Sequence, residues 1–212
     1  MAFRNFYLIE SEKVAESKFN FDHLDSLETF EEKIKYCKEN LEQIGKGSSR
    51  LVFTLTSKTV LKLAWNKKGL EQNTLESSDQ IHKLFGDLVP ALKKKCKGDE
   101  IYWIVMEKAK PVDEQTFEKI SKIPFKTFQK AMKEMKLVNY KEKEDVSEET
   151  KKLLKSSHFL DLVQDLTFSL GLLVGDVIKT SSWGTIGNRL VILDPGLSLL
   201  IFRSLYHKKH RK

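Results

Sequence analysis

Val60-Leu61-Lys62-Leu63-Ala64 is an apolar, strand-like run with a lysine at its centre. Side chains alternate between the two faces of a strand, so Lys62 lies on the face opposite Leu61 and Leu63. An ammonium group that is buried without a partner is costly, so we expect Lys62 to meet a carboxylate, a phosphate or water. The run therefore predicts a buried strand in which Lys62 binds an anionic group. The alternative is an edge strand whose lysine reaches solvent.

A glycine-containing stretch upstream of this strand favours a phosphate as the partner. Gly45-Lys46-Gly47-Ser48-Ser49 lies between two further strand-like runs, and Gly47 precedes Lys62 by fifteen positions (62−47). Glycine and small polar residues allow backbone N–H groups to approach a phosphate closely. The alternative for such a string is an ordinary hairpin turn.

The pattern of apolar residues predicts an antiparallel sheet followed by helices. Strands are expected ahead of Gly45, at residues 50–56, 59–64 and 100–106, and at 190–193. Helices are expected at residues 26–41, 70–85, 116–123, 124–137, 147–156 and 159–173. The first helix would be capped by Asp25 or Ser26. We divide the chain into an N-terminal helical extension (1–40), a sheet-rich lobe (41–110) and a helical lobe (111–212).

Composition limits the functional classes. The net charge of +7 is compatible with a polyanionic partner, but charges of both signs are spread along the chain, so nucleic-acid binding is not favoured. The two cysteines, Cys37 and Cys96, show no metal-binding or disulfide spacing. The most apolar segment, residues 159–178, contains three aspartates, which argues against a membrane span. We expect a soluble, cytoplasmic protein without a signal peptide.

Two aspartates near the C-terminal end of the chain form its strongest candidate functional motif. Asp176 follows a glycine, and Asp194 follows the apolar run Val191-Ile192-Leu193, eighteen positions later (194−176). A carboxylate at the end of a buried strand, followed by Pro195-Gly196, can present an oxygen ligand to Mg²⁺. The alternative is a simple strand-to-turn aspartate.

Taken in order, these motifs resemble the protein-kinase-like superfamily, and in particular small kinase-like proteins of phages and bacteria. The resemblance spans residues 41–197. It implies an α+β, two-lobed fold, with a small antiparallel-sheet N-lobe that carries one main helix and a truncated, mostly helical C-lobe. It also implies ATP and Mg²⁺ as ligands.

In this resemblance the first lobe holds the nucleotide. Residues 45–52 are similar to the kinase glycine-rich loop, although Arg50 replaces its third glycine. Lys62 matches the lysine that contacts the α- and β-phosphates, and Glu76, fourteen positions later (76−62), matches its glutamate partner, with Glu71 as the competitor. The residues implied in nucleotide binding are Gly45, Lys46, Gly47, Ser48, Lys62, Glu76, Met106, Glu107 and Ala109. Of these, Met106 would be the gatekeeper, and the Glu107 carbonyl and Ala109 amide would bind the adenine edge.

The second lobe would supply the catalytic and metal-binding groups. Asp176 would orient or deprotonate the acceptor hydroxyl, Asp194 would bind Mg²⁺, and Lys179 would reach the γ-phosphate. The metal-binding asparagine of the family is replaced by Ser181, or by Ser182 if Trp183-Gly184 sets the register. Sixteen residues follow Gly196 (212−196), too few for the segment and helices with which kinases bind peptides.

Three functions follow from these features. The first is a phosphotransferase that uses Mg-ATP to modify a protein or a small molecule. The second is a pseudokinase, a nucleotide-sensing module that regulates a host or partner protein. The third and least favoured is a basic nucleic-acid-binding protein, and none of the three predicts a membrane partner.

Overall fold

The computed structural model describes residues 19–140 and 146–195, with the backbone alone for 137–140. The chain forms two compact units. Of the described residues, unit 1 contains 19–78 and Ala91–Lys108, and unit 2 contains Asp79–Pro90 and those that follow Lys108.

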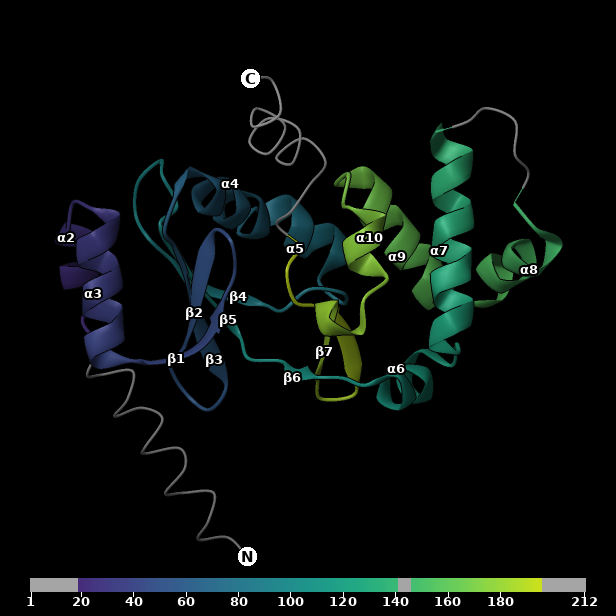
Figure 1. Cartoon of the computed structure of the whole chain (residues 1–212), viewed down its shortest axis with the longest axis horizontal. Coiled ribbons are helices and arrows are strands. Elements are labelled where there is room, and N and C mark those ends of the chain that lie inside the picture. Colours follow the sequence, from purple (N-terminus) through teal and green to yellow (C-terminus); the bar gives the residue numbers. More distant parts are fainter. Residues whose placement is uncertain (1–18, 141–145, 196–212) are drawn as a thin grey trace, which may run out of the picture. The chain divides into compact units, whose positions relative to one another are not determined.

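Unit 1 is built around a five-stranded antiparallel sheet with the strand order β1-β2-β3-β5-β4 (Figure 1). Its elements are α2 (Phe21–Ser26), α3 (Phe30–Asn40), β1 (Glu42–Lys46), β2 (Arg50–Thr54), β3 (Thr59–Ala64), α4 (Lys67–Glu76), β4 (Leu92–Lys95) and β5 (Trp103–Glu107).

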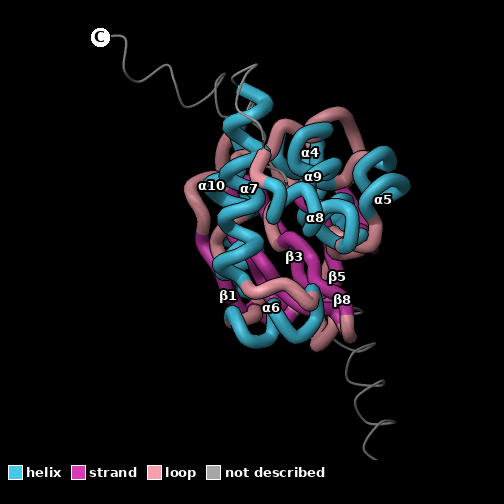
Figure 2. Tube along the Cα trace, turned by 90° about the vertical axis from the view of Figure 1, so that its right-hand side faces the viewer, coloured by secondary structure: helices cyan, strands magenta, loops and turns pink. Residues whose placement is uncertain are grey.

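Strand β3 lies at the middle of this sheet, between β2 and β5 (Figure 2 shows β3 beside β5), and all six of its residues are buried. Lys62 is opposite Val52 of β2 and Ile104 of β5. Leu61 and Leu63 belong to the unit 1 core, while helix α4 also packs against β3. Lys62 is therefore a buried lysine of a central strand, and the edge-strand alternative is wrong.

The first predicted helix, over residues 26–41, corresponds to α3 and starts later than expected, and the separate helix α2 before it was not predicted. Helix α2 ends at Ser26, and α3 starts after Thr29, whose side chain accepts a hydrogen bond from the Glu32 N–H while Glu32 reaches back to the Thr29 N–H. This reciprocal cap satisfies two N–H groups at the helix start, so it competes successfully with a cap at Asp25 or Ser26.

The helix predicted over residues 70–85 is broken. Helix α4 ends at Glu76, and α5 (Asp79–Phe85) belongs to unit 2. Serine and aspartate favour caps and turns over helix interiors because their side chains bond to nearby backbone. The Ser77-Ser78-Asp79 sequence accordingly separates the two helices.

Unit 2 is mostly helical and contains a three-stranded sheet with the order β6-β7-β8. After α5, its elements are β6 (Lys110–Pro111), α6 (Glu114–Ser121), α7 (Phe125–Tyr140), α8 (Glu148–Ser156), α9 (His158–Ser169), α10 (Val174–Val177), the 3₁₀ turn η1 (Thr180–Ser182), β7 (Trp183–Ile186) and β8 (Arg189–Ile192). Four aromatic side chains, Phe117, Phe128, Phe159 and Trp183, contact one another in its core.

The predicted α+β class is confirmed by these elements. Strands β4, β6 and β7 were missed. Strand β4 is the lysine-rich stretch Leu92–Lys95, β6 is only two residues long, and β7 lies in a segment rich in turn residues. Within the described part of the chain, no helix has the length and apolar character needed to cross a membrane. Gly196, the last residue of the Asp194-Pro195-Gly196 motif, lies outside the described residues.

Candidate functional site

The turn between β1 and β2 carries the predicted glycine-rich loop. The Gly47 N–H donates to the Arg50 carbonyl (2.8 Å), and Lys46, Gly47 and Ser48 are exposed. A Cβ placed on Gly47 would be 3.7 Å from the Arg50 oxygen, an ordinary contact. The turn itself therefore has no need of a glycine at this position, which leaves close approach of a ligand as a reason for one.

The end of this turn is fixed to the start of helix α4. The Ser49 hydroxyl donates to Gln72 Oε1 (2.5 Å), and the Asn66 side-chain amide donates to the Ser48 carbonyl (3.1 Å). Gly69 allows this contact, because a Cβ there would lie 2.3 Å from the Ser49 carbonyl oxygen. The turn and the helix that carries Glu76 are thus held together.

Lys62 and Glu76 form the ion pair that the sequence predicted. The Lys62 ammonium donates to Glu76 Oε1 across the interface of β3 and α4. Glu76 is the last residue of α4 and is completely buried, whereas the competing Glu71 is exposed. The structure thus brings Glu76, and not Glu71, to the lysine.

Arg50 is a third member of this cluster, and the sequence reasoning missed its role. Its Nη1 donates to Glu76 Oε2 (2.5 Å) and to Asn73 Oδ1 (3.2 Å), and the residue is 5% exposed. Strand alternation places Arg50 on the same face of β2 as Val52, the residue opposite Lys62. The same alternation argument that singled out Lys62 could have identified Arg50.

The electrostatics of the cluster favour an ionised Glu76. Burial alone would raise the pKa of this carboxyl group, but Arg50 and Lys62, through charge and hydrogen bonds, outweigh burial and hold its pKa below the ordinary value of 4.5. Glu76 is therefore an ionised carboxylate at neutral pH.

The residues predicted to bind adenine lie at the end of unit 1 and the start of unit 2. Met106 is completely buried in β5, and the Glu107 carboxylate pairs with Lys93 (3.1 Å) and accepts the Ala91 N–H (3.3 Å). The division between the units falls between Lys108 and Ala109. The proposed contacts of the Glu107 carbonyl and the Ala109 amide with adenine remain predictions.

In unit 2, Asp176 lies in the short helix α10 and accepts a hydrogen bond from the Lys179 ammonium (2.7 Å). Both side chains are partly open to solvent, with relative exposures of 42% and 59%. A pair this exposed contributes little to stability. The Asp176 carboxylate and the Lys179 ammonium can therefore separate to bind a ligand with little loss of unfolding free energy.

The short sheet of unit 2 brings the two predicted aspartate segments together. Trp183 is completely buried and its indole N–H donates to the Val177 carbonyl (2.8 Å), which ties α10 to β7. The Leu193 N–H donates to the Ser182 carbonyl (2.9 Å), so the segment before Asp194 runs beside the serines that follow Asp176. Ser181 and Asp194 are both exposed. Across residues 19–140 and 146–195, no cluster of three or more His, Cys, Asp or Glu side chains is arranged to hold a metal ion.

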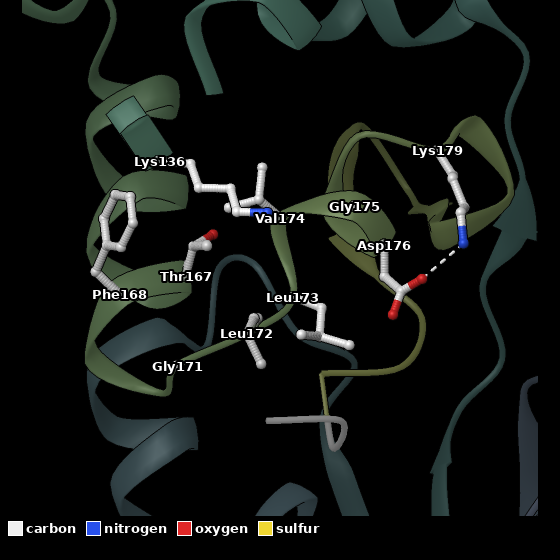
Figure 3. A pocket seen from close by; sticks show the side chains of 10 residues that line it. All are labelled: Lys136, Thr167, Phe168, Gly171, Leu172, Leu173, Val174, Gly175, Asp176 and Lys179. Carbon is white, nitrogen blue, oxygen red and sulfur yellow. Dashed lines mark hydrogen bonds and ion pairs between the residues drawn. The ribbon is translucent and has the colours of Figure 1, made fainter. Parts of the chain in front are cut away.

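A pocket of about 460 Å³ adjoins Asp176 (Figure 3). Asp176 and Lys179 lie on one side of it, and Thr167 and Phe168 of α9 lie on the other with Lys136 of α7. Its remaining lining comes from the segment 171–175. No sequence pattern indicated this pocket, because its residues come from three separate elements.

No protein-family model and no curated protein matches the chain. Solved structures similar to it include three aminoglycoside phosphotransferases, which are members of the protein-kinase-like superfamily. The ternary complex of APH(2″)-IIa with streptomycin and ATP is 13% identical over 78% of this chain and 70% of that one, with a TM-score of 0.36. The GDP complex of aminoglycoside 2′-phosphotransferase-IIIa is 11% identical over 80% and 73%, with a TM-score of 0.39. ADP-bound APH(2″)-Ib is 13% identical over 79% and 69%, with a TM-score of 0.35. Similarity this distant says nothing about the substrate of the present chain.

Proposed function

We propose that the chain binds Mg-ATP and transfers its terminal phosphoryl group to a hydroxyl group of an acceptor. The observation that carries this proposal is the buried pair of Lys62 and Glu76, which joins the central strand β3 to the helix α4. A lysine on the third strand that pairs with a glutamate of the following helix is the arrangement with which protein kinases hold the α- and β-phosphates.

Unit 1 would bind the nucleotide. The backbone N–H groups of the turn formed by Gly45, Lys46, Gly47 and Ser48 would contact the phosphates, and Lys62 would neutralise part of their charge. The end of β5 would bind the adenine through the backbone of Glu107 and Ala109, behind the buried side chain of Met106. These contacts would position the nucleotide, which is the main task of a phosphotransferase site.

Unit 2 would supply the metal-binding and acceptor-binding groups. Asp194 and Ser181 offer exposed oxygen atoms, the ligand type that Mg²⁺ prefers, and Mg²⁺ commonly uses only one or two carboxylates besides phosphates and water. The bound cation would neutralise charge on the phosphates. Asp176 would hold the acceptor hydroxyl and accept its proton, and Lys179 would bind the γ-phosphate. The adjoining pocket has the size of a small-molecule site, which favours a small acceptor over a protein.

A second candidate is a pseudokinase that binds nucleotide and regulates a partner protein. It is favoured by one observation, the serine at the position where the family has its metal-binding asparagine. A hydroxyl is a weaker Mg²⁺ ligand than an amide carbonyl, so binding could persist while transfer is lost. Either function would suit the cytoplasm of a bacterial or phage-infected cell, where ATP and Mg²⁺ are available.

Nucleotide binding is tested by thermal shift with ATP alone, Mg²⁺ alone and both together. Lys62→Met is expected to abolish the ATP-induced shift. Lys33→Met is the matched control, because Lys33 is another buried lysine of unit 1 but is bonded to the carbonyls of Leu24 and Leu27. An unchanged ATP shift in Lys62→Met would refute the nucleotide site.

Phosphoryl transfer from labelled ATP separates the two candidates. For the enzyme, Asp176→Asn should abolish transfer while ATP still binds, and the control Asp161→Asn, at an exposed site on α9, should leave transfer unchanged. For the pseudokinase, the wild type transfers nothing. In that case Ser181→Asn or Ser182→Asn tests whether the missing asparagine is the cause.

A further inference from the structure

The described lining of the pocket beside Asp176 carries more positive than negative charge. Its charged residues are Lys136, Asp176 and Lys179. Asp176 and Lys179 bond to each other at 2.7 Å, so their charges largely offset one another. Lys136 comes from α7 on the other side of the pocket, and its side chain extends towards Val174 (Figure 3). The pocket therefore presents a cation on the side away from the Asp176 carboxylate.

The position of Lys136 follows from the packing of α7 against the segment that contains α10. The Gln129 side-chain amide of α7 donates to the carbonyl of Ile178, the residue after α10 (2.8 Å), and Met132, one turn further along α7, is completely buried. Lys136 follows Gln129 by seven residues (136−129), which is about two helical turns, so both lie on the same face of α7. The helix register thus places Lys136 over the pocket.

Helix α9, which also borders the pocket, does not need Lys136 as a cap. Lysine side chains often bond to the last carbonyls of a helix, and Thr167 and Phe168 lie near the C-terminal end of α9. Their carbonyls, however, accept the N–H groups of Leu172 (2.7 Å) and Gly171 (3.2 Å). Gly171 has a φ of +60°, which allows the chain to turn back in this way. Lys136 can therefore bind a ligand without withdrawing a cap from α9.

Much of the remaining lining is apolar and is supplied by Phe168, Leu172, Leu173 and Val174. A ligand that fills the pocket would place a hydrocarbon body against these side chains. A single lysine matches the one negative charge of a carboxylate, whereas a phosphate dianion would keep an unpaired charge beside apolar walls. A cationic ligand would meet Lys136 with like charge, which selects against it.

We propose that the acceptor is a small hydroxyl compound with an apolar body and a carboxylate group. Lys136 binds the carboxylate, and Asp176 holds the hydroxyl group that receives the phosphoryl group. This inference rests on the proposed function and names the class of its acceptor. It makes Lys136 the residue that determines the charge of the acceptor.

The test is NMR titration of the whole chain, without nucleotide, with small hydroxyl compounds in matched sets of three. One set is meta-hydroxymethylbenzoate, the corresponding amide and the corresponding benzylamine. The backbone amide signals of Gly171 and Gly175, which both line the pocket, report binding. The carboxylates should bind about tenfold more tightly than the amides, as expected for one charged hydrogen bond, and the amines should bind most weakly.

Variants of Lys136 test whether this residue is the source of the preference. Lys136→Gln should remove the preference for carboxylates over amides, and Lys136→Glu should reverse it in favour of the amines. Lys133→Glu is the matched control, because Lys133 is an exposed lysine of α7 that does not line the pocket, and the preference should persist in it. Carboxylates that bind no more tightly than amides to the wild type, or a preference that survives in Lys136→Glu, would overturn the proposal.

The failure of this inference can be distinguished from the failure of the proposed function. An ATP-induced thermal shift that is unchanged in Lys62→Met refutes the nucleotide site, whatever binds in the pocket. A Lys62-dependent ATP shift without a carboxylate preference in the pocket refutes only the class of acceptor.

Discussion

The shared carboxylate predicts an asymmetry in stability within the cluster. Lys62→Met removes one cation but leaves Glu76 bonded to Arg50 at 2.5 Å. The loss is then one charged hydrogen bond, about 1.5–3 kcal/mol. Glu76→Gln removes the carboxylate that both cations share and leaves two buried positive charges side by side. We expect it to lower the free energy of unfolding by about 3–5 kcal/mol. The glutamate should therefore matter more to the fold than either of its partners.

Hydrogen–deuterium exchange of peptides that cover β2 and β3 measures this difference inside unit 1. At about 1.4 kcal/mol per tenfold, Glu76→Gln should accelerate exchange by about two to three and a half orders of magnitude, and Lys62→Met by about one to two. Peptides from unit 2, such as those that cover α9, serve as an internal control.

One result would refute the reasoning. If Lys62→Met accelerates exchange in β2 and β3 as much as Glu76→Gln, then Arg50 does not support Glu76 when Lys62 is gone, and the shared-carboxylate description fails. A further check is Arg50→Met/Lys62→Met, which leaves the carboxylate without either cation. The loss of unfolding free energy in this double variant should exceed the sum of the losses in the two single variants.

Three further predictions follow from the geometry around this cluster. Gly47→Ala should leave the melting temperature unchanged, because its Cβ meets only an ordinary 3.7 Å contact, yet it should weaken ATP binding; equal binding would argue against phosphate contact at the turn. Gly69→Ala should destabilise unit 1 by about 2 kcal/mol or more, because its Cβ would lie 2.3 Å from the Ser49 carbonyl, and a neutral effect in urea unfolding would contradict that packing. The lowered pKa of Glu76 means that its stabilising contribution is complete above the ordinary value of 4.5 and is lost as the pH falls through the lower folded value. Urea unfolding from pH 7 down to pH 3 should therefore show an acid decline that is smaller in Glu76→Gln, and parallel declines would exclude Glu76 as its source.

Much of unit 1 could be predicted because its signals are local. The alternation around Lys62 and the turn at Ser57-Lys58 indicate the hairpin of β2 and β3. The continuous helix predicted over residues 70–85 was wrong, because apolar periodicity continues through Ser77-Ser78 although the helix does not. Strand β7 could not be recognised locally, since it is defined by pairing with β6 and β8.

The sequence by itself determined that an apolar strand carries Lys62, since a cation in an alternating apolar run must find an anionic partner or reach solvent. It also offered Glu76 and the competing Glu71 on the next helix as partners, and the structure chose Glu76. Only the tertiary structure decided which cations share that carboxylate. Arg50 is twelve positions from Lys62 (62−50) and twenty-six from Glu76 (76−50), and the three meet because β2 pairs with β3 and α4 packs on the same face. Such a contact depends on strand register and helix packing, which no local pattern encodes.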